Sequence, residues 1–220
     1  AKRALALPFP DHPRRGEARM KLGELLLARA EEARLRAGGG TKAEIPPEDV
    51  DEAIKFYSEA HKLFESTIAE LSGLLEGMKG ARTDAADSAA IAYRQKLQSD
   101  IRQSQLLSAK SIEERGRSRA EASPERKSDL ETALSMFSDL YMKEQKLVAV
   151  RNYALFYRST IQATLGMTDE AIDGFQRIAD QVSSVFVPIV LGLALLTFLG
   201  WLVIGQVGFT AAMVHAVAVL

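Results

Sequence analysis

The sequence VSSVFVPIVLGLALLTFLGWLVI, from Val182 to Ile204, is about 23 residues of nearly unbroken apolar side chains. As a helix, a segment of this length covers the roughly 30 Å hydrocarbon thickness of a bilayer. The surrounding segment 181–220 contains no Asp, Glu, Lys or Arg, although these residues make up 26% of the whole chain. The segment therefore predicts one membrane-spanning helix, with a buried helix of a soluble core as the alternative. Its position at the C-terminal end excludes a signal peptide.

The residues in and after this span predict how it lies in a bilayer. The span is marked by Val182, Pro188, Trp201 and Ile204. Pro188 is expected near the start of the helix, where the hydrogen bonds that it disrupts lie within the first turns. Phe209–Leu220 is only about twelve residues, roughly 18 Å as a helix, and is too short to cross. We expect it to pack back against the first helix or to lie in the membrane interface.

The tail resembles a known family of membrane proteins. Ile178–Pro188 (IADQVSSVFVP) and Leu195–Leu199 (LLTFL), followed by Trp201 and Leu202, resemble a core transmembrane helix of the heavy-metal-transporting P-type ATPases, the copper and zinc exporters. Ala216–Leu220 (AVAVL) resembles the start of the next helix. The resemblance covers residues 176–220 and implies that the preceding residues are cytoplasmic. In that family the second helix soon reaches a metal-binding Cys-Pro-Cys motif, whereas this chain contains no cysteine.

The family's catalytic motifs are also absent from the sequence. There is no Asp-Lys-Thr-Gly phosphorylation loop, no Thr-Gly-Glu actuator motif and no nucleotide-binding domain. Soft metals such as Cu(I) need thiolate or thioether ligands, and the tail offers only Met213 and His215, which project in different directions from a helix. We therefore predict no metal site and no cofactor.

Upstream of the tail, the composition predicts an all-α fold. Residues 1 to about 180 are rich in Ala, Leu, Glu, Lys and Arg, which are strong helix formers, and lack runs typical of strands. The predicted helices are Glu17 to about Ala37, ending at Gly38–Gly40; Pro46-Pro47 to about Met78; about Ala85 to Glu114, with Ala89, Tyr93, Leu97 and Ile101 as one apolar stripe; and one from Ser123-Pro124. A turn at Leu165–Met167 separates two more. This pattern predicts antiparallel helical hairpins.

A short pattern recurs within these helices. AIKFY from Ala53, ALSMF from Ala133 and AIDGF from Ala171 each place an aromatic residue four positions after a small one. Tyr157–Phe175, with its Leu-Gly turn at 165–166, resembles the tetratricopeptide repeat, a helix–turn–helix of about 34 residues, and residues 45–175 as a whole resemble degenerate arrays of it. An Ala-rich bundle with chance matches is the alternative.

The resemblance to the repeat implies a binding surface. Repeat hairpins stack into a concave face that binds peptides or partner helices. By resemblance, Tyr153, Phe156, Thr160 and Ala163 would face that groove, so the expected partner is a protein or peptide. The expected domains are an N-terminal helical segment with a Gly-rich linker at 1–44, a repeat-like domain at 45–180 and a membrane segment at 181–220.

Charge and chemistry argue against several other functions. The net charge of −1 gives no field that would recruit nucleic acid. The basic run Arg115–Arg119 is expected to be a solvated loop, and paired acids such as Glu113-Glu114 are expected on charged helix faces or in first turns. His12, His61 and His215 are far apart in sequence, and no nucleophile elbow or phosphate loop appears. We predict no catalytic residues and no small-molecule substrate.

Two functional hypotheses follow. The first is a non-catalytic, membrane-anchored helical-repeat scaffold with residues 1–180 in the cytoplasm. The second is a fragment or fusion of a heavy-metal-transporting P-type ATPase that lacks the catalytic and metal-binding motifs. The two resemblances meet within 175–180, the chain opens with Ala1, and it ends within an apolar segment. These features suggest a chimera or a fragment.

Overall fold

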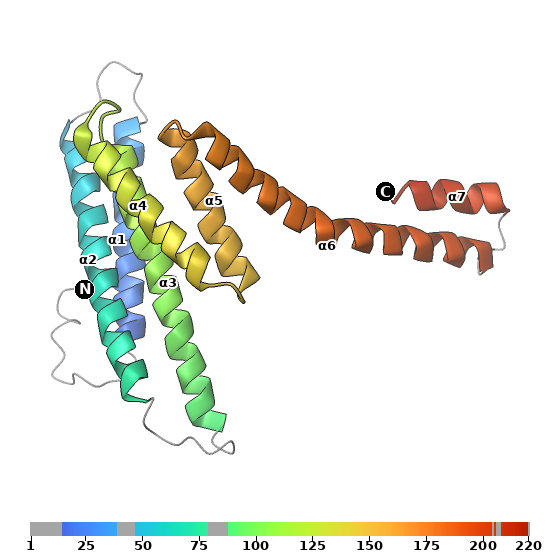
Figure 1. Ribbon diagram of the computed structural model, residues 1–220, viewed down its shortest axis with the longest axis horizontal. Coiled ribbons are helices and arrows are strands. Elements are labelled where there is room, and N and C mark those ends of the chain that lie inside the picture. Colours follow the sequence, from blue (N-terminus) through green and yellow to red (C-terminus); the bar gives the residue numbers. More distant parts are fainter. Residues whose placement is uncertain (1–14, 39–46, 79–87, 204, 206–207, 220) are drawn as a thin grey trace. The chain divides into compact units, whose positions relative to one another are not determined.

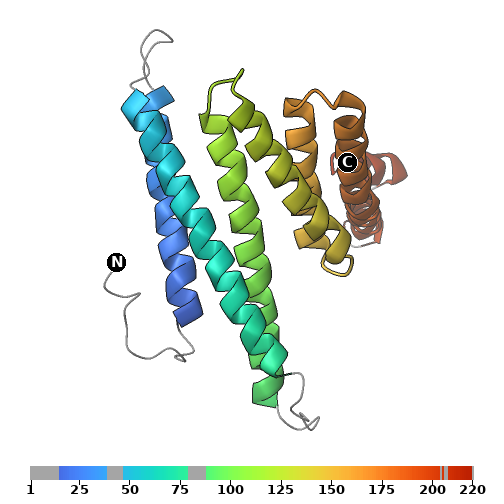
Figure 2. The ribbon, with the colours of Figure 1, turned by 60° about the vertical axis from the view of Figure 1, so that its left-hand side comes forward.

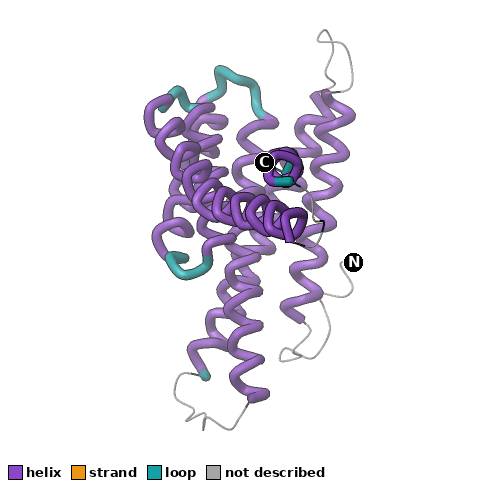
Figure 3. The backbone as a smooth tube through the Cα atoms, turned by 90° about the vertical axis from the view of Figure 1, so that its right-hand side faces the viewer, coloured by secondary structure: helices purple, strands orange, loops and turns teal. Residues whose placement is uncertain are grey.

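A computed structural model describes residues 15–38, 47–78, 88–203, 205 and 208–219. Over these residues the chain forms seven α-helices and no strand, which confirms the all-α prediction (Figure 3). The chain divides into two compact units, residues 1–171 and 172–220. The Gly-rich break at 39–40, His12 and Ile204 lie outside the described residues.

The first unit is a row of antiparallel helices, each packed against its neighbour in the sequence (Figures 1 and 2). The row consists of α1 (Arg15–Gly38), α2 (Pro47–Gly77), α3 (Ser88–Ser118), α4 (Pro124–Lys143) and α5 (Val148–Thr164). α3 lies in the middle of this row and contacts helices on both sides. The predicted succession of antiparallel hairpins is therefore present.

Local signals in the sequence explain where these helices begin and end. Ser123 caps α4, because its hydroxyl accepts a hydrogen bond of 3.0 Å from the Arg126 backbone N–H, and Pro124 occupies the first turn. α5 ends at a turn in which Gly166 has a φ of 80° and the Met167 N–H donates to the Gln162 carbonyl at 2.9 Å. Both signals were predicted from the sequence.

The recurring small–aromatic pattern lies at the contacts between helices. Ala53 and Tyr57 of α2 form a core with Ala30 and Ala33 of α1. A second core joins α3, α4 and α5, and its buried members are Ala109, Ile112, Leu130, Ala133, Phe137, Leu140, Ala154 and Ile161. The small residue lets two helices approach, and the aromatic ring fills the space beside it. In α2 and α4 the pattern therefore reflects the packing of one helix against another.

The structure does not confirm tetratricopeptide repeats. α2 and α3 have 31 residues each, so that either helix alone nearly fills a repeat of about 34 residues. The repeat assignment therefore stays a prediction, and an antiparallel array of long and short helices is what the structure supports.

Three predictions for α3 are wrong. The helix continues to Ser118, so Arg115 and Arg117 lie in its last turns and are not part of a solvated loop. Glu113 is not on a charged face, since its side chain is 1% exposed. The apolar stripe is buried only at Leu97 and Ile101, whereas Ala89 and Tyr93 are exposed. In each case the neighbours of the helix, which the local pattern does not reveal, decide which face is buried.

The second unit contains most of α6 (Thr168–Val203) and all of α7 (Phe209–Val217). α6 is one continuous helix of 36 residues, and the boundary between the two units falls in its first turn. Pro188 therefore lies inside the helix and not near its start, which corrects the prediction. The helix begins early because no proline separates Thr168 from the apolar segment, and an isolated glycine such as Gly174 is tolerated inside a helix.

α7 folds back along the end of α6 (Figure 1). The Phe198 and Phe209 rings meet edge to face with centroids 5.5 Å apart, and Trp201 stacks on His215 at 4.4 Å. Ala212 of α7 is fully buried. These contacts confirm that the short C-terminal segment packs against the preceding helix.

Candidate functional site

The most exposed apolar surface of the second unit lies on α6. Among the described residues, α6 is the one helix long and apolar enough to cross a membrane, with a mean hydropathy of 2.4 over 18 residues of which 6% are buried. Val182, Pro188 and Trp201 are all exposed. A core helix of a soluble protein would bury such a surface against its neighbours. The exposure of these side chains favours a lipid environment over the soluble alternative.

A second candidate lies on α5, and we call Tyr153, Phe156, Thr160 and Ala163 the α5 surface. Their spacing of three or four residues places them on one face, whereas Ala154, Leu155, Ser159, Ile161 and Gln162 are buried. Tyr153 and Phe156 are 39% and 48% exposed. Both rings rest on Tyr157, with centroids 4.6 Å and 5.4 Å from its own. The four residues therefore share an aromatic-rich face, whose role in binding stays a prediction.

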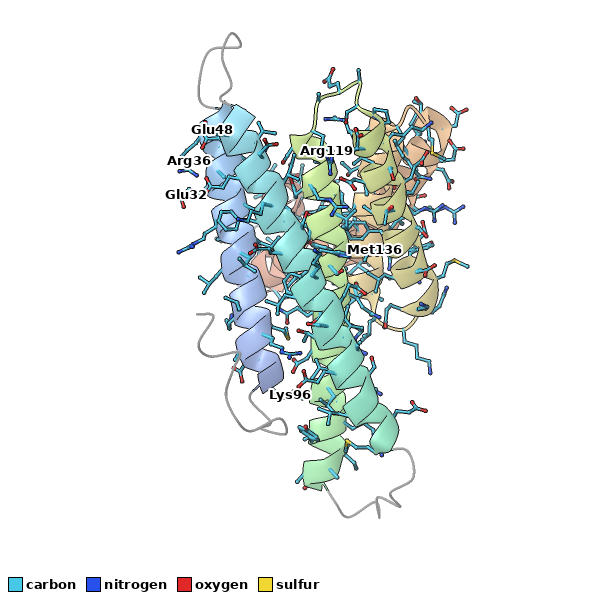
Figure 4. The ribbon with its side chains drawn as sticks, turned by 90° about the vertical axis from the view of Figure 1, so that its left-hand side faces the viewer. Glu32, Arg36, Glu48, Lys96, Arg119 and Met136 are labelled. Atoms are coloured by element: carbon cyan, nitrogen blue, oxygen red, sulfur yellow. The ribbon has the colours of Figure 1, made fainter. Side chains whose placement is uncertain are left out.

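The arginines at the end of α3 are bound within the protein. Arg115 donates to both carboxylate oxygens of Asp129 on α4, at 3.0 Å and 2.5 Å, and reaches the Ser58 hydroxyl of α2 at 3.3 Å. Arg119, labelled in Figure 4, donates to the same carboxylate at 2.8 Å. These contacts join three helices. They also occupy the guanidinium groups that a phosphate would need.

Ion pairs also join α1 and α2. Arg36, also labelled in Figure 4, lies on α1 with its guanidinium 2.6 Å from the Glu52 carboxylate and 3.6 Å from Asp49 on α2. Half of the Arg36 side chain is exposed, so this pair is screened by water and contributes little to stability. The pair places a positive charge of α1 opposite negative charges of α2.

A buried acidic site lies on α3 beside these arginines. Glu113 Oε1 accepts a hydrogen bond from Arg117 Nε at 2.9 Å and lies 2.8 Å from Arg117 Nη2, while the buried Oε2 has no hydrogen-bond partner among the described residues. Burial raises the pKa of Glu113 to about 7, although Arg117 opposes this shift. One turn earlier, the Lys110 ammonium reaches the Tyr157 hydroxyl of α5 at 2.9 Å. Charged groups of α3 thus lie in the core that it shares with α4 and α5.

His61, Ser108 and Glu65 form a chain of hydrogen bonds between α2 and α3. The buried Ser108 hydroxyl donates to Glu65 at 2.6 Å, and its oxygen lies 2.9 Å from His61 Nδ1. Serine is the middle member of this chain, whereas a catalytic triad needs histidine between the hydroxyl and the carboxylate. Burial also lowers the pKa of His61. The arrangement fixes the two helices and does not activate a nucleophile.

The first unit has a small hollow between its helices, and the second unit has a larger, more open one of about 420 Å³ beside Thr197 and Trp201. A hollow of about 150 Å³ between α2, α3 and α4 is lined in part by Glu65, Met136 and Asp139. Ligand pockets usually measure roughly 300–1,000 Å³. Within the described ranges, no group of three His, Cys, Asp or Glu residues is placed to hold a metal ion. His61 and His215 lie on α2 and α7, and His215 is stacked on Trp201.

The comparisons with known proteins match only a short stretch of the chain. No family model matches the sequence, and no solved structure matches it. A copper-exporting P-type ATPase of Staphylococcus saprophyticus subsp. saprophyticus is 54% identical over 46 residues. This stretch is 20% of the present chain and 6% of that ATPase. The match supports the resemblance of one short segment to a metal-transporting ATPase and does not extend to the whole protein.

Sequence reasoning missed the polar contacts of α3. Glu113, Arg115 and Asp129 lie in a chain segment rich in charge, and their types alone suggest a solvated surface. A weak signal was present, since Ser104, Ser108, Ser111 and Gly116 are small residues on different sides of α3, and all four are buried. Small residues on more than one side of a helix indicate that it is packed on both sides, where charged neighbours must find partners.

Proposed function

We propose that this protein is a membrane-anchored helical domain without catalytic activity, which binds another protein or a peptide through the α5 surface. The observation that carries the proposal is the continuity of α6. This one helix begins at Thr168 with Asp169 and Glu170 in its first turn and runs to Val203 through exposed apolar sequence. A helix with such a long apolar part can hold the chain in a membrane.

The α5 surface supports the second half of the proposal. Aromatic side chains that are exposed on a rigid helix give large contact areas at low entropic cost, and tyrosine is common at binding hot spots. Tyr153 and Phe156 have this character, and Tyr157 holds both rings in place. Placement of residues 1–180 in the cytoplasm is part of the proposal and rests on the resemblance to the transporters.

Trp201 gives a direct test of the membrane anchor, because it is the single tryptophan of the chain. In liposomes that contain brominated lipids, we expect the tryptophan emission of the full chain to be strongly quenched. Aqueous iodide should have little effect. Emission that iodide quenches and brominated lipid does not would place Trp201 in water and reject the anchor.

Binding through the α5 surface can be tested in cells. A photo-crosslinking amino acid at Phe156 should form one specific adduct with another protein, whereas the same group at Ser128, an exposed position of α4, should not. Equal adduct patterns from the two positions would reject the α5 surface as a binding site.

The second candidate function is a piece of a heavy-metal-transporting P-type ATPase joined to a helical domain. The 46-residue match to a copper exporter favours it. Extension of the reading frame beyond Leu220 tests this candidate. A Cys-Pro-Cys motif followed by Asp-Lys-Thr-Gly would support the transporter, and a stop codon or unrelated sequence would reject it.

A further inference from the structure

Glu113 occupies a position that an ionised carboxylate does not favour. It follows Ile112 on α3, in the core where Ile112 packs with Leu130 of α4 and Ile161 of α5. The Glu113 side chain is 1% exposed. Among the residues that the structure describes, Arg117 is its charged hydrogen-bond partner and binds Oε1, while the buried Oε2 receives no donor. Burial of a charge with half of its hydrogen bonds missing is costly, and a neutral carboxyl group in the same place costs much less.

We propose that Glu113 is a protonation switch, which stabilises the packing of α3, α4 and α5 when its carboxyl group is neutral and loosens this packing when it is ionised. The device goes beyond the proposed anchoring and binding function. It acts on the helix that carries the α5 surface, because α5 belongs to the same core.

The charged groups around Glu113 set the pH at which the switch acts. Burial is the largest cause of its raised pKa of about 7, with Glu114 adding to the shift and Arg117 and Lys110 opposing it. On α5, the phenol of Tyr153 interacts with Glu113. Burial, Tyr157 and Glu113, in this order of size, raise the pKa of the phenol. From α4, Asp129 is held by Arg115 and Arg119, and Arg126 donates to the Arg117 and Arg119 carbonyls.

The direction of the pH effect follows from these values. The pKa of Glu113 rises from an ordinary 4.5 to about 7 on folding, so the folded protein binds the proton more tightly than the unfolded chain. The folded state is therefore most favoured below pH 4.5, and this advantage is lost as the pH rises towards 7 and above. Between pH 6 and 8 the folding equilibrium constant should fall about tenfold through Glu113 alone. His61, whose pKa is lowered by burial from its ordinary 6.5, has an effect of the opposite sign as the pH passes 6.5, and this effect is the same in the wild-type protein and in a Glu113 variant.

The full chain in detergent micelles allows a direct test. Urea titrations followed by circular dichroism at pH 6, 7 and 8 should show about a tenfold loss of the folding equilibrium constant for the wild-type protein. Glu113→Gln, which keeps the shape of a neutral carboxyl group, should not show this loss and should be at least as stable at pH 8 as at pH 6. Glu125→Gln, at an exposed glutamate of α4, is the matched control and should keep the wild-type dependence.

A second measurement does not depend on the folding of a variant. The infrared C=O band of a protonated carboxyl group should be visible in the wild-type protein at pH 6 and disappear with a midpoint near pH 7. The absence of any carboxyl group titrating there would overturn the proposal. A Glu113→Gln protein with an unchanged stability–pH slope would overturn it as well.

Discussion

The Asp129 carboxylate lies at the centre of a polar network that joins α2, α3 and α4. It is bound by Arg115 and Arg119, and Arg115 also reaches Ser58. The Asp129 side chain is only 9% exposed, so water can replace little of this network. The sequence showed the charges but not their pairing, because the partners lie ten or more residues apart and meet only when α4 turns back along α3.

Asp129→Asn should therefore destabilise the protein strongly. The substitution keeps the volume but leaves two guanidinium groups without their counter-charge, and removal of one partner from a buried ion pair costs about 3–5 kcal/mol. Chemical denaturation measures this loss. Asp139→Asn is the control, since the Asp139–Lys143 pair is about two-thirds exposed on both sides and should contribute less than about 1 kcal/mol. Equal losses in the two variants would contradict the role of Asp129.

Gly23 is required by the close approach of α1 and α2. A Cβ atom at this position would lie 2.5 Å from the ring of Phe64, which is fully buried, so the ring would have to shift. Gly23→Ala should lower the free energy of unfolding by about 1–3 kcal/mol, the usual cost of overpacking. In α2, Gly73 has nothing within 4 Å of the same atom, so Gly73→Ala should instead stabilise the helix by up to about 1 kcal/mol. Thermal denaturation of the two variants should give shifts of opposite sign.

At the scale of the element, α4 and α5 show the contrast between a buried and an exposed helix face. Phe137 of α4 is fully buried and stacks on Tyr157 of α5 at 5.2 Å, whereas Phe156 of α5 is half exposed. Phe137→Ala should cost about 3–5 kcal/mol of stability. Phe156→Ser should cost less than about 1 kcal/mol and abolish partner binding. A large loss of stability from Phe156→Ser would mean that the α5 surface is part of the core.

The N-cap of α4 is an element signal that the sequence already showed. Ser123→Ala removes the acceptor for the Arg126 N–H and should destabilise the protein by about 1 kcal/mol. Ser138→Ala is a suitable control in the same helix, because the Ser138 hydroxyl only bonds the Leu134 carbonyl one turn earlier. The control should change the unfolding free energy by less than about 0.5 kcal/mol.

Helix starts and turns were predictable because their causes are local. Pro47, Ser123-Pro124 and the turn at 165–167 fix backbone geometry within a few residues, and the structure has helix ends at each of them. The extent of α3 and the continuity of α6 were not predictable in this way. α3 extends past Glu114, and there Arg115 forms an ion pair with Asp129 of α4. α6 crosses the expected domain boundary because residues 175–181 include no residue that ends a helix.

At the scale of the whole molecule, the chain combines two units whose surfaces suit different environments. The first unit buries small and aromatic residues between charged helices, and the second exposes an apolar helical segment that carries no charge after Asp180. The division was visible in the composition, since charge ends at Asp180. The binding role of the α5 surface was not visible in the composition, because exposed aromatic residues do not identify the protein or peptide that they bind.

The central claim is that α6 holds this protein in a bilayer, and carbonate extraction tests it most directly. The full chain should remain with the membrane pellet after an alkaline carbonate wash, while a chain that ends at Asp180 should be released into the supernatant. The second chain keeps α1 to α5 and the first turns of α6, so the comparison isolates the apolar segment. A full chain that is soluble and monomeric without detergent would contradict the account and make α6 the core helix of a soluble protein.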